Sequence, residues 1–99
     1  MSEFTSDLAA NFSIRHESDK YRYELLDGDE LIGMASYHPD AEDKVWDFNS
    51  THVDSKYGGQ GLAAKLVTHA LTDAKAAGHE IKATCSYVVQ MLRKHPELG

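Results

Sequence analysis

The chain has 99 residues, of which 41% are hydrophobic, and its 16 acidic and 10 basic side chains give a formal net charge of −6. This length allows one hydrophobic core, so we expect residues 1–99 to form a single domain. The negative charge argues against non-specific binding to nucleic acid. The absence of a long apolar run, a signal-peptide pattern and a second cysteine favours a cytoplasmic protein that has no membrane partner.

The first half of the chain shows the period-two alternation that is typical of half-buried β-strands. The expected strands are residues 12–17, 21–25, 31–37 and 45–53. The turn at residues 27–30 contains a glycine and predicts a hairpin between the second and third strands. Because the connections are too short for crossovers, the four strands are expected to form an antiparallel meander. Ahead of them, Ser6 and Asp7 are suited to cap a short helical turn.

The second half of the chain has a helical pattern on each side of one short strand. The apolar stripe of the first helix comprises Leu62, Leu66, Ala70 and Ala74, and the same face is widened by Val67 and Leu71. This spacing predicts an amphipathic helix, and Gly78 stands where the helix should stop. Residues 80–84 follow as a fifth strand, which the intervening helix allows to lie parallel to the fourth. Ser86 is predicted to cap a short C-terminal helix over residues 87–94. The fold class is therefore α+β.

The most informative stretch is the glycine-rich turn between the fourth strand and the helix. Residues 57–63 read Tyr-Gly-Gly-Gln-Gly-Leu-Ala, which places free backbone N–H groups at the positive end of a helix dipole. This arrangement favours an anion, most simply a phosphate, although a flexible loop remains the alternative. A P-loop is excluded because its second glycine and its hydroxyl residue are missing. A dinucleotide fingerprint is disfavoured because the turn follows four antiparallel strands instead of opening the domain.

Residues 50–96 resemble the GNAT superfamily of N-acetyltransferases, and in particular its short single-domain branch that carries a cysteine after the fifth strand. Gly61 and Ala63 match the superfamily signature Q/R-x-x-G-x-G/A, whereas Gly58 replaces its leading Gln or Arg. Residues 83–88, Ala-Thr-Cys-Ser-Tyr-Val, together with 95–97, His-Pro-Glu, resemble the second signature of the branch. In the strand before the turn, Thr51 and Val53 match the branch, with Ser50 at its usual histidine.

The resemblance implies a GNAT-like fold that binds acetyl-coenzyme A, with no metal. The pyrophosphate would lie on the backbone amides of the turn, and the pantetheine arm would run between the fourth and fifth strands. The implied cofactor-binding residues are Val53, Gly58, Gly59, Gln60, Gly61, Leu62 and Ala63. The implied activity moves an acetyl group from acetyl-CoA to the amine of a small molecule or protein, by a monomer or a homodimer. The alternative is a non-catalytic CoA-binding or regulatory module.

Cys85 is the first candidate for a catalytic residue. A strand end that faces a helix start can lower the pKa of a thiol, and the thiolate is the reactive form. Cys85 would either accept the acetyl group and pass it to the amine or line the site of a direct transfer. Its other interpretation is a small buried hydrophobe.

The residue that would remove the proton from the amine is left open by the sequence. The candidates on the fourth strand are Asp47, Asn49, Ser50 and His52. Alternation places His52 and Val53 on opposite faces of this strand. Tyr87 would either protonate the leaving thiolate or flank the cofactor. The histidines show no spacing suited to a metal site.

Overall fold

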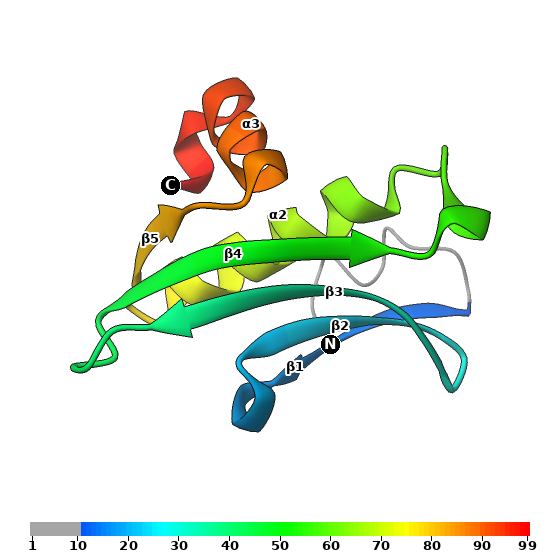
Figure 1. Cartoon of the computed structure of the whole chain (residues 1–99), viewed down its shortest axis with the longest axis horizontal. Helices are drawn as coiled ribbons and strands as arrows, with labels where there is room; N and C mark the ends of the chain where they lie inside the picture. The colour runs from blue at the N-terminus through cyan, green and yellow to red at the C-terminus, as the bar shows by residue number, and fades with distance from the viewer. Residues whose placement is uncertain (1–10) are drawn as a thin grey trace.

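The computed structural model describes residues 11–99, which form one mixed sheet with helix α2 packed on one face and helix α3 beside the β5 edge (Figure 1). The strands are β1 (Phe12–Glu17), β2 (Arg22–Asp27), β3 (Glu30–Pro39), β4 (Val45–Val53) and β5 (Glu80–Ala83). The α-helices are α2 (Leu62–Ala76) and α3 (Ser86–Lys94). The short 3-10 helices are η1 (Ser18–Lys20), η2 (Ser55–Tyr57) and η3 (Pro96–Leu98). The helical turn predicted at Ser6 and Asp7 lies outside the described residues.

The sheet has the predicted topology. Its strand order is β1-β2-β3-β4-β5, so each strand pairs with its neighbour in sequence. The first four strands are antiparallel, while β5 lies parallel to β4 after the crossover through α2. The α+β prediction with a four-stranded meander and a parallel fifth strand is therefore confirmed.

The hydrophobic core lies between the sheet and α2. The sheet contributes the buried side chains of Tyr23, Leu25, Ile32, Ala35, Tyr37, Trp46 and Phe48. The helix contributes its predicted stripe together with the buried residues Val67 and Leu71, which widen it as predicted. Gly78 ends the helix as predicted, with a positive φ of 95°. The N–H groups of Gly78 and His79 bond to the carbonyls of Lys75 and Ala74, which closes the last turn.

Several element boundaries differ from the prediction: β2 and β3 each end two residues later than expected, and β3 begins one residue earlier. Strand β2 begins at Arg22 because Tyr21 adopts a left-handed conformation (φ 54°) that ends η1. Strand β5 ends at Ala83 because the N–H groups of Thr84 and Cys85 both turn onto the carbonyl of Phe48. Helix α3 begins at Ser86 with Cys85 as its N-cap residue, so the predicted Ser86 cap is wrong by one position.

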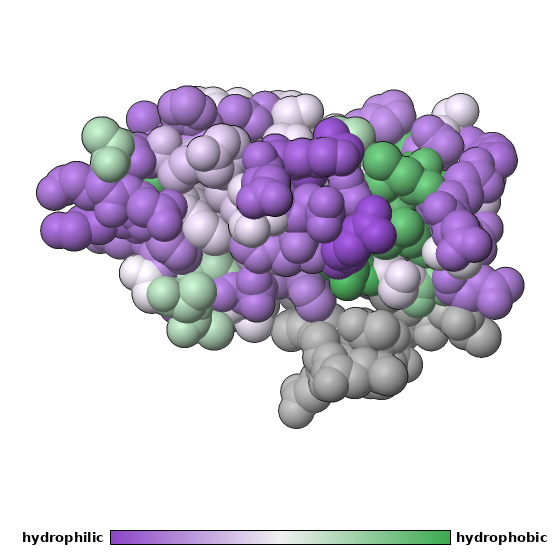
Figure 2. Space-filling model, turned by 90° about the horizontal axis from the view of Figure 1, so that it is seen from below, coloured by the Kyte–Doolittle hydropathy of each residue, from purple (hydrophilic) through white to green (hydrophobic). Residues whose placement is uncertain are grey.

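The opposite face of the sheet is polar, and no described helix covers it. On this face the buried Glu24 carboxylate accepts hydrogen bonds from Arg15 and Arg22 at 2.6 Å and 2.7 Å. Burial opposes the charge of Glu24, but these two guanidinium groups outweigh it and lower the pKa of the carboxyl group. Seen from below the orientation of Figure 1, the surface is mostly hydrophilic, with one hydrophobic area toward the right (Figure 2). No helix within residues 11–99 is long and apolar enough to span a membrane.

Candidate functional site

A bulge in β4 decides which side chains of this strand face α2. Tyr37 pairs with Phe48 and Ser36 pairs with Ser50, so Asn49 has no counterpart on β3. A bulge adds one residue and thereby reverses the alternation beyond it. Thr51 now stands opposite the buried Ala35 and faces α2.

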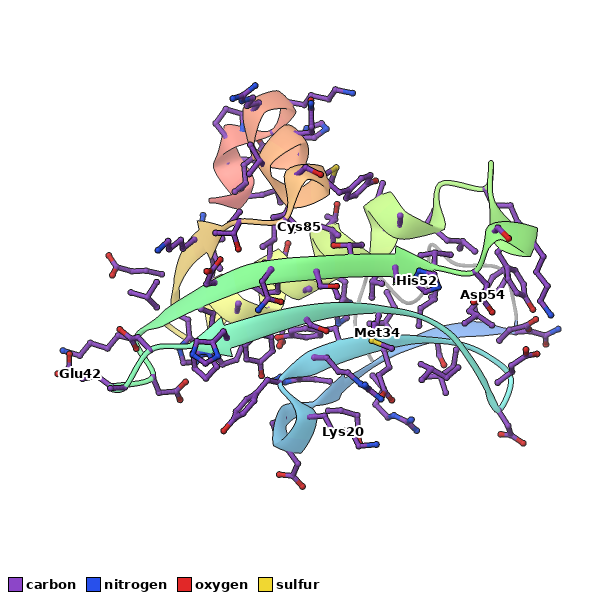
Figure 3. All side chains as sticks on the ribbon, viewed as in Figure 1. Lys20, Met34, Glu42, His52, Asp54 and Cys85 are labelled. Carbon is purple, nitrogen blue, oxygen red and sulfur yellow. The ribbon has the colours of Figure 1, made fainter. Side chains whose placement is uncertain are left out.

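The same bulge lies where β4 and β5 separate. The two strands pair only from Val45 and Glu80 to Phe48 and Ala83. The carbonyl of Phe48 then accepts hydrogen bonds from the N–H groups of both Thr84 and Cys85, each at 3.1 Å. Beyond this point the last five residues of β4 continue without a partner on β5. The end of β4 and the start of α3 therefore diverge in a V, which we call the fork (Figure 3).

The glycine turn directs several backbone donors toward one place. Gly59 and Gly61 have left-handed φ angles of 79° and 71°, a conformation that side chains rarely adopt. Gly61 is the N-cap of α2 and supplies no side-chain cap, and the first turn contains no acidic residue. Lys65 is the first residue of the helix whose N–H bonds to a backbone carbonyl, that of Gly61. The N–H groups of residues 62–64 have no acceptor within the helix, and donors at such a position suit an anion.

A cavity of about 240 Å³ opens between the glycine turn, the end of β4 and α3. It is lined by Val53, Asp54, Ser55, Tyr57, Gly58, Gly59, Gly61, Leu62, Ala63, Ala64 and Tyr87. The structure thus brings together six of the seven predicted cofactor-binding residues. Gln60 is the exception, because it is exposed at the tip of the turn and does not line the cavity.

A steric restriction explains why glycine occupies position 58. Its φ of −62° is open to any residue, so the backbone does not require glycine there. A Cβ atom at this position would lie 3.1 Å from the carbonyl oxygen of Ser55, tighter than ordinary contacts. The η2 turn, whose Gly58 N–H bonds to that same carbonyl, therefore crowds any side chain in place of the usual Gln or Arg.

Cys85 lies beyond the cavity, in the fork. Its thiol donates a hydrogen bond to the hydroxyl oxygen of Thr51 across the fork, at 3.5 Å. Burial alone would raise the pKa of the Cys85 thiol, but the Thr51 hydroxyl and the N–H groups of Val88, Tyr87 and Thr51 outweigh it, so the pKa is lowered. Tyr87 and Val88 lie in the first turn of α3, so the start of this helix contributes to lowering the pKa of the thiol.

The candidates for the proton acceptor lie on the polar face of the sheet. Ser50 and His52 pair with Ser36 and Met34 and so face away from α2. Their position confirms that His52 and Val53 lie on opposite faces. His52 contacts Asp54 (Nε2 to Oδ1, 3.5 Å), with two thirds of its side chain exposed.

Asp47 lies just before the fork, on the polar face of the sheet, one residue before the last pair between β4 and β5. It is the residue before Phe48, and the hydroxyl of Thr84 donates to its Oδ1 at 3.1 Å. Thr84 directly precedes Cys85, so this hydrogen bond ties the carboxylate to the segment that carries the thiol. Among the four candidates, Asp47 is the one whose side chain is hydrogen-bonded to the segment that carries the thiol.

Tyr87 lines the cavity from the first turn of α3 and keeps 37% of its surface exposed. Burial raises the pKa of its phenol. No group of three or more metal-binding side chains gathers in the part of the chain that the structure describes.

The sequence model of the GCN5-related N-acetyl-transferase family matches residues 22–99. The chain belongs to this family. The match begins at the start of β2 and includes the glycine turn, the fork and Cys85. A search of the curated proteins finds no match.

Solved structures of GCN5-related proteins share the fold. A GCN5-like protein from Staphylococcus aureus superposes with a TM-score of 0.67 at 22% identity, over 91% of this chain and 86% of that one. A GNAT family acetyltransferase from Elizabethkingia anophelis, solved with acetyl-CoA bound, gives 0.64 at 17% identity, over 92% and 76%. An aminoglycoside acetyltransferase from an uncultured soil metagenomic sample gives 0.55 at 18% identity, over 87% and 57%.

The sequence does not predict the contact of Thr51 with Cys85, nor the cavity-lining residues Asp54, Ser55, Tyr57 and Ala64. The sequence indicates Thr51 only through its match to the family, although its spacing of two from Val53 places both residues on one face of the strand. The sequence indicates Tyr57 only as part of the turn, yet this residue lines the cavity and its hydroxyl donates to Asp27 at 2.6 Å. The Asn49 bulge has no signal in the sequence, because no glycine or proline marks it.

Proposed function

We propose that this protein binds acetyl-CoA in the cavity beside the glycine turn and transfers the acetyl group to an amine. The observation that carries the proposal is that the cavity is lined from both sides of the fork, by Val53 at the end of β4 and by Tyr87 in α3, each two residues beyond Thr51 and Cys85. The donors of the turn and of α2 suit a diphosphate at one end, and Cys85 with Thr51 stands at the other. The acetyl-CoA complex of the Elizabethkingia anophelis neighbour supports the same cofactor.

In the direct route, the neutral amine attacks the thioester carbonyl of acetyl-CoA. The new C–N bond forms, the C–S bond breaks, and CoA leaves as a thiolate. The amine nitrogen loses a proton, which we assign to the carboxylate of Asp47 because Thr84 ties it to the segment that carries the thiol. Protonation of the CoA thiolate completes the balance.

In the covalent route, the Cys85 thiolate attacks the thioester and becomes an acetyl-cysteine, and CoA leaves. The amine then attacks this second thioester, releases the Cys85 thiolate and yields the same amide. The lowered pKa of Cys85 supports this route, since it increases the thiolate fraction near neutral pH.

The first experiment is calorimetry with acetyl-CoA, and absence of binding at millimolar cofactor would exclude both an acetyltransferase and a CoA-binding module. Mass spectrometry of the protein after incubation with acetyl-CoA then tests for acetyl on Cys85. If Cys85→Ala transfers acetyl to amines as fast as the wild type, the covalent route is wrong. Binding without transfer to any amine would instead support the non-catalytic module.

A further inference from the structure

The glycine turn is fastened to a distant part of the sheet. Asp54, the residue before η2, donates its N–H to the carbonyl of Ile32 at 2.8 Å. Lys56 approaches Glu30 at 3.6 Å between Nζ and Oε2. The hydroxyl of Tyr57 donates to Oδ2 of Asp27 at 2.6 Å. All three contacts connect the start of the turn to the β2–β3 hairpin, residues 27–32, about 25 positions earlier in the chain.

Among these contacts, the Tyr57–Asp27 hydrogen bond is the one suited to fix a geometry. The Lys56–Glu30 pair is formed by side chains that are 63% and 57% exposed, so its contribution is small. Tyr57, by contrast, is half-buried, and the ring of Phe12 meets it edge to face at 5.8 Å between centroids. The hydrogen bond to the Asp27 carboxylate raises the pKa of Tyr57 to about 12, so the phenol stays a donor throughout the physiological range.

Asp27 is itself held in place at the end of β2. It pairs with Phe12 on β1 and with Glu30 on β3. The next residue, Gly28, donates its N–H to the carbonyl of Asn11 at 2.7 Å. The acceptor of the Tyr57 hydroxyl is therefore part of the sheet instead of a loose loop.

The turn that Tyr57 precedes needs such support. Three glycines fall within residues 58–61, and glycine loses more conformational freedom on ordering than any other residue. A ligand that binds the amides of this turn must offset that loss unless the free protein already holds the turn. Tyr57 both lines the cavity and is fixed to the sheet, so it connects the support to the ligand site.

We propose that Tyr57 and Asp27 are positioning residues, whose hydrogen bond holds the glycine turn in the conformation that binds acetyl-CoA. This inference rests on the proposed function, because it assigns the turn to that cofactor. The β2–β3 hairpin thereby becomes part of the cofactor site without touching the cofactor.

The test is the affinity of purified full-length variants for acetyl-CoA, measured by calorimetry at a temperature where each variant is folded. Tyr57→Phe keeps the ring and removes only the hydroxyl, and Asp27→Ala removes the acceptor. Each should weaken binding about three- to tenfold, as expected for one hydrogen bond to a partly exposed carboxylate. The double variant should be no weaker than either single one, since all three lose the same interaction.

Three controls separate positioning from other effects. Asp27→Asn keeps an oxygen acceptor and should retain most of the affinity, whereas a role in repelling the anionic cofactor would make Asp27→Ala bind more tightly. Tyr21→Phe removes a phenolic hydroxyl from a side chain that is 52% exposed, at η1, and should bind like the wild type. In the free protein, ¹⁵N order parameters at Gly58, Gly59 and Gly61 should fall in Tyr57→Phe, a change that a general loss of stability would not confine to these amides.

Unchanged affinity of Tyr57→Phe, with the wild type binding acetyl-CoA, would overturn the inference and leave the proposed function intact. If affinity falls but the order parameters of the turn do not, the hydroxyl acts by another route and the positioning role is equally wrong. Absence of binding by the wild type itself would reject the proposed function.

Discussion

The two ends of the sheet differ in how densely they pack against α2. At one end, side chains from every strand or its flank are stacked: His16 on Tyr23, Tyr37 on Trp46, and Trp46 on His79, with ring centroids 3.8–4.2 Å apart. At the other end, β4 and β5 diverge and the helix starts without a side-chain cap. The first end is filled with rings, whereas the second leaves a cavity of about 240 Å³.

This difference assigns stability and binding to separate places on one strand. Trp46, near the start of β4, is only 6% exposed, while Val53, at its end, lines the cavity. The net free energy of unfolding of a small domain is only a few kilocalories per mole. The cost of leaving backbone donors without partners must therefore be offset by dense packing elsewhere. Substitutions at the two ends should therefore affect different observables.

The largest expected effect on stability is that of Trp46→Ala. It removes a buried ring that stacks on both Tyr37 and His79, and such truncations cost about 3–5 kcal/mol. Urea unfolding should show this loss, while the fraction that remains folded should bind acetyl-CoA with wild-type affinity. A parallel loss of affinity in the folded fraction would show that the two ends are coupled.

Gly61→Val should weaken binding of acetyl-CoA more than it lowers stability, the reverse of Trp46→Ala. A β-branched residue at a φ of 71° costs roughly 1–3 kcal/mol, so the loss of stability should be smaller than that of Trp46→Ala. Gly61 lines the cavity and no atom lies within 4 Å of a Cβ placed there, so we expect the added side chain to occupy open space beside the start of α2. Affinity for acetyl-CoA should fall more than about tenfold by calorimetry. Gly78→Val, at a positive φ of 95° just after the far end of α2 and with no atom within 4 Å of its added Cβ, is the control for backbone strain.

The end of the sheet that is filled with rings, the packed end, was easier to predict from the sequence than the end that leaves the cavity, the open end. Local alternation and the fourfold stripe of α2 specify which faces are buried, and short connections leave only the meander. The order of elements from β1 to α3 follows from these rules alone. Tyr21 is an exception, since its left-handed conformation goes against the β preference of tyrosine and could not be expected.

At the open end, the sequence identified the parts but not how they meet. Counting alternation from the buried Phe48 without the bulge would turn Ser50 and His52 toward α2, and Thr51 and Val53 away from it. The extra residue at Asn49 reverses that assignment and brings Thr51 to Cys85. A bulge is a compromise between pairing with β3 and separation from β5, so it depends on contacts that no local pattern records.

The reactivity of Cys85 tests the contact between its thiol and the Thr51 hydroxyl across the fork. Thr51→Val has nearly the same shape but removes the hydroxyl that stabilises the thiolate, so the pKa of Cys85 should rise. The rate of alkylation by iodoacetamide, measured from pH 6 to 10, should shift its midpoint to higher pH in this variant. Ser50→Ala, on the opposite face, should leave the profile unchanged. An unchanged profile in Thr51→Val would mean that α3 and the backbone alone set the pKa.

The smallest expected effect is a pH dependence located at the packed end. Burial lowers the pKa of His16, against the opposing influence of Asp73 and Glu17 and together with that of His79. Because the folded pKa lies below the unfolded value of about 6.5, the unfolded chain takes up a proton first as pH falls. The contribution of His16 to stability is therefore fully present above that value and is lost as pH falls through the folded pKa.

Urea midpoints at pH 7.5 and pH 5.0 measure this contribution. His16→Gln keeps a side chain that can bond to the hydroxyl of Tyr37, now 2.7 Å from Nε2, but cannot take up the proton. It should lose less stability between the two pH values than the wild type, whereas His38→Gln, at an exposed position, should behave like the wild type. Acetyl-CoA affinity at pH 7.5 should be the same in all three proteins, because His16 lies at the end of the sheet that the cofactor does not reach. If His16→Gln alters that affinity, the packed end is coupled to the fork through α2, and stability and binding do not depend on separate ends of the sheet.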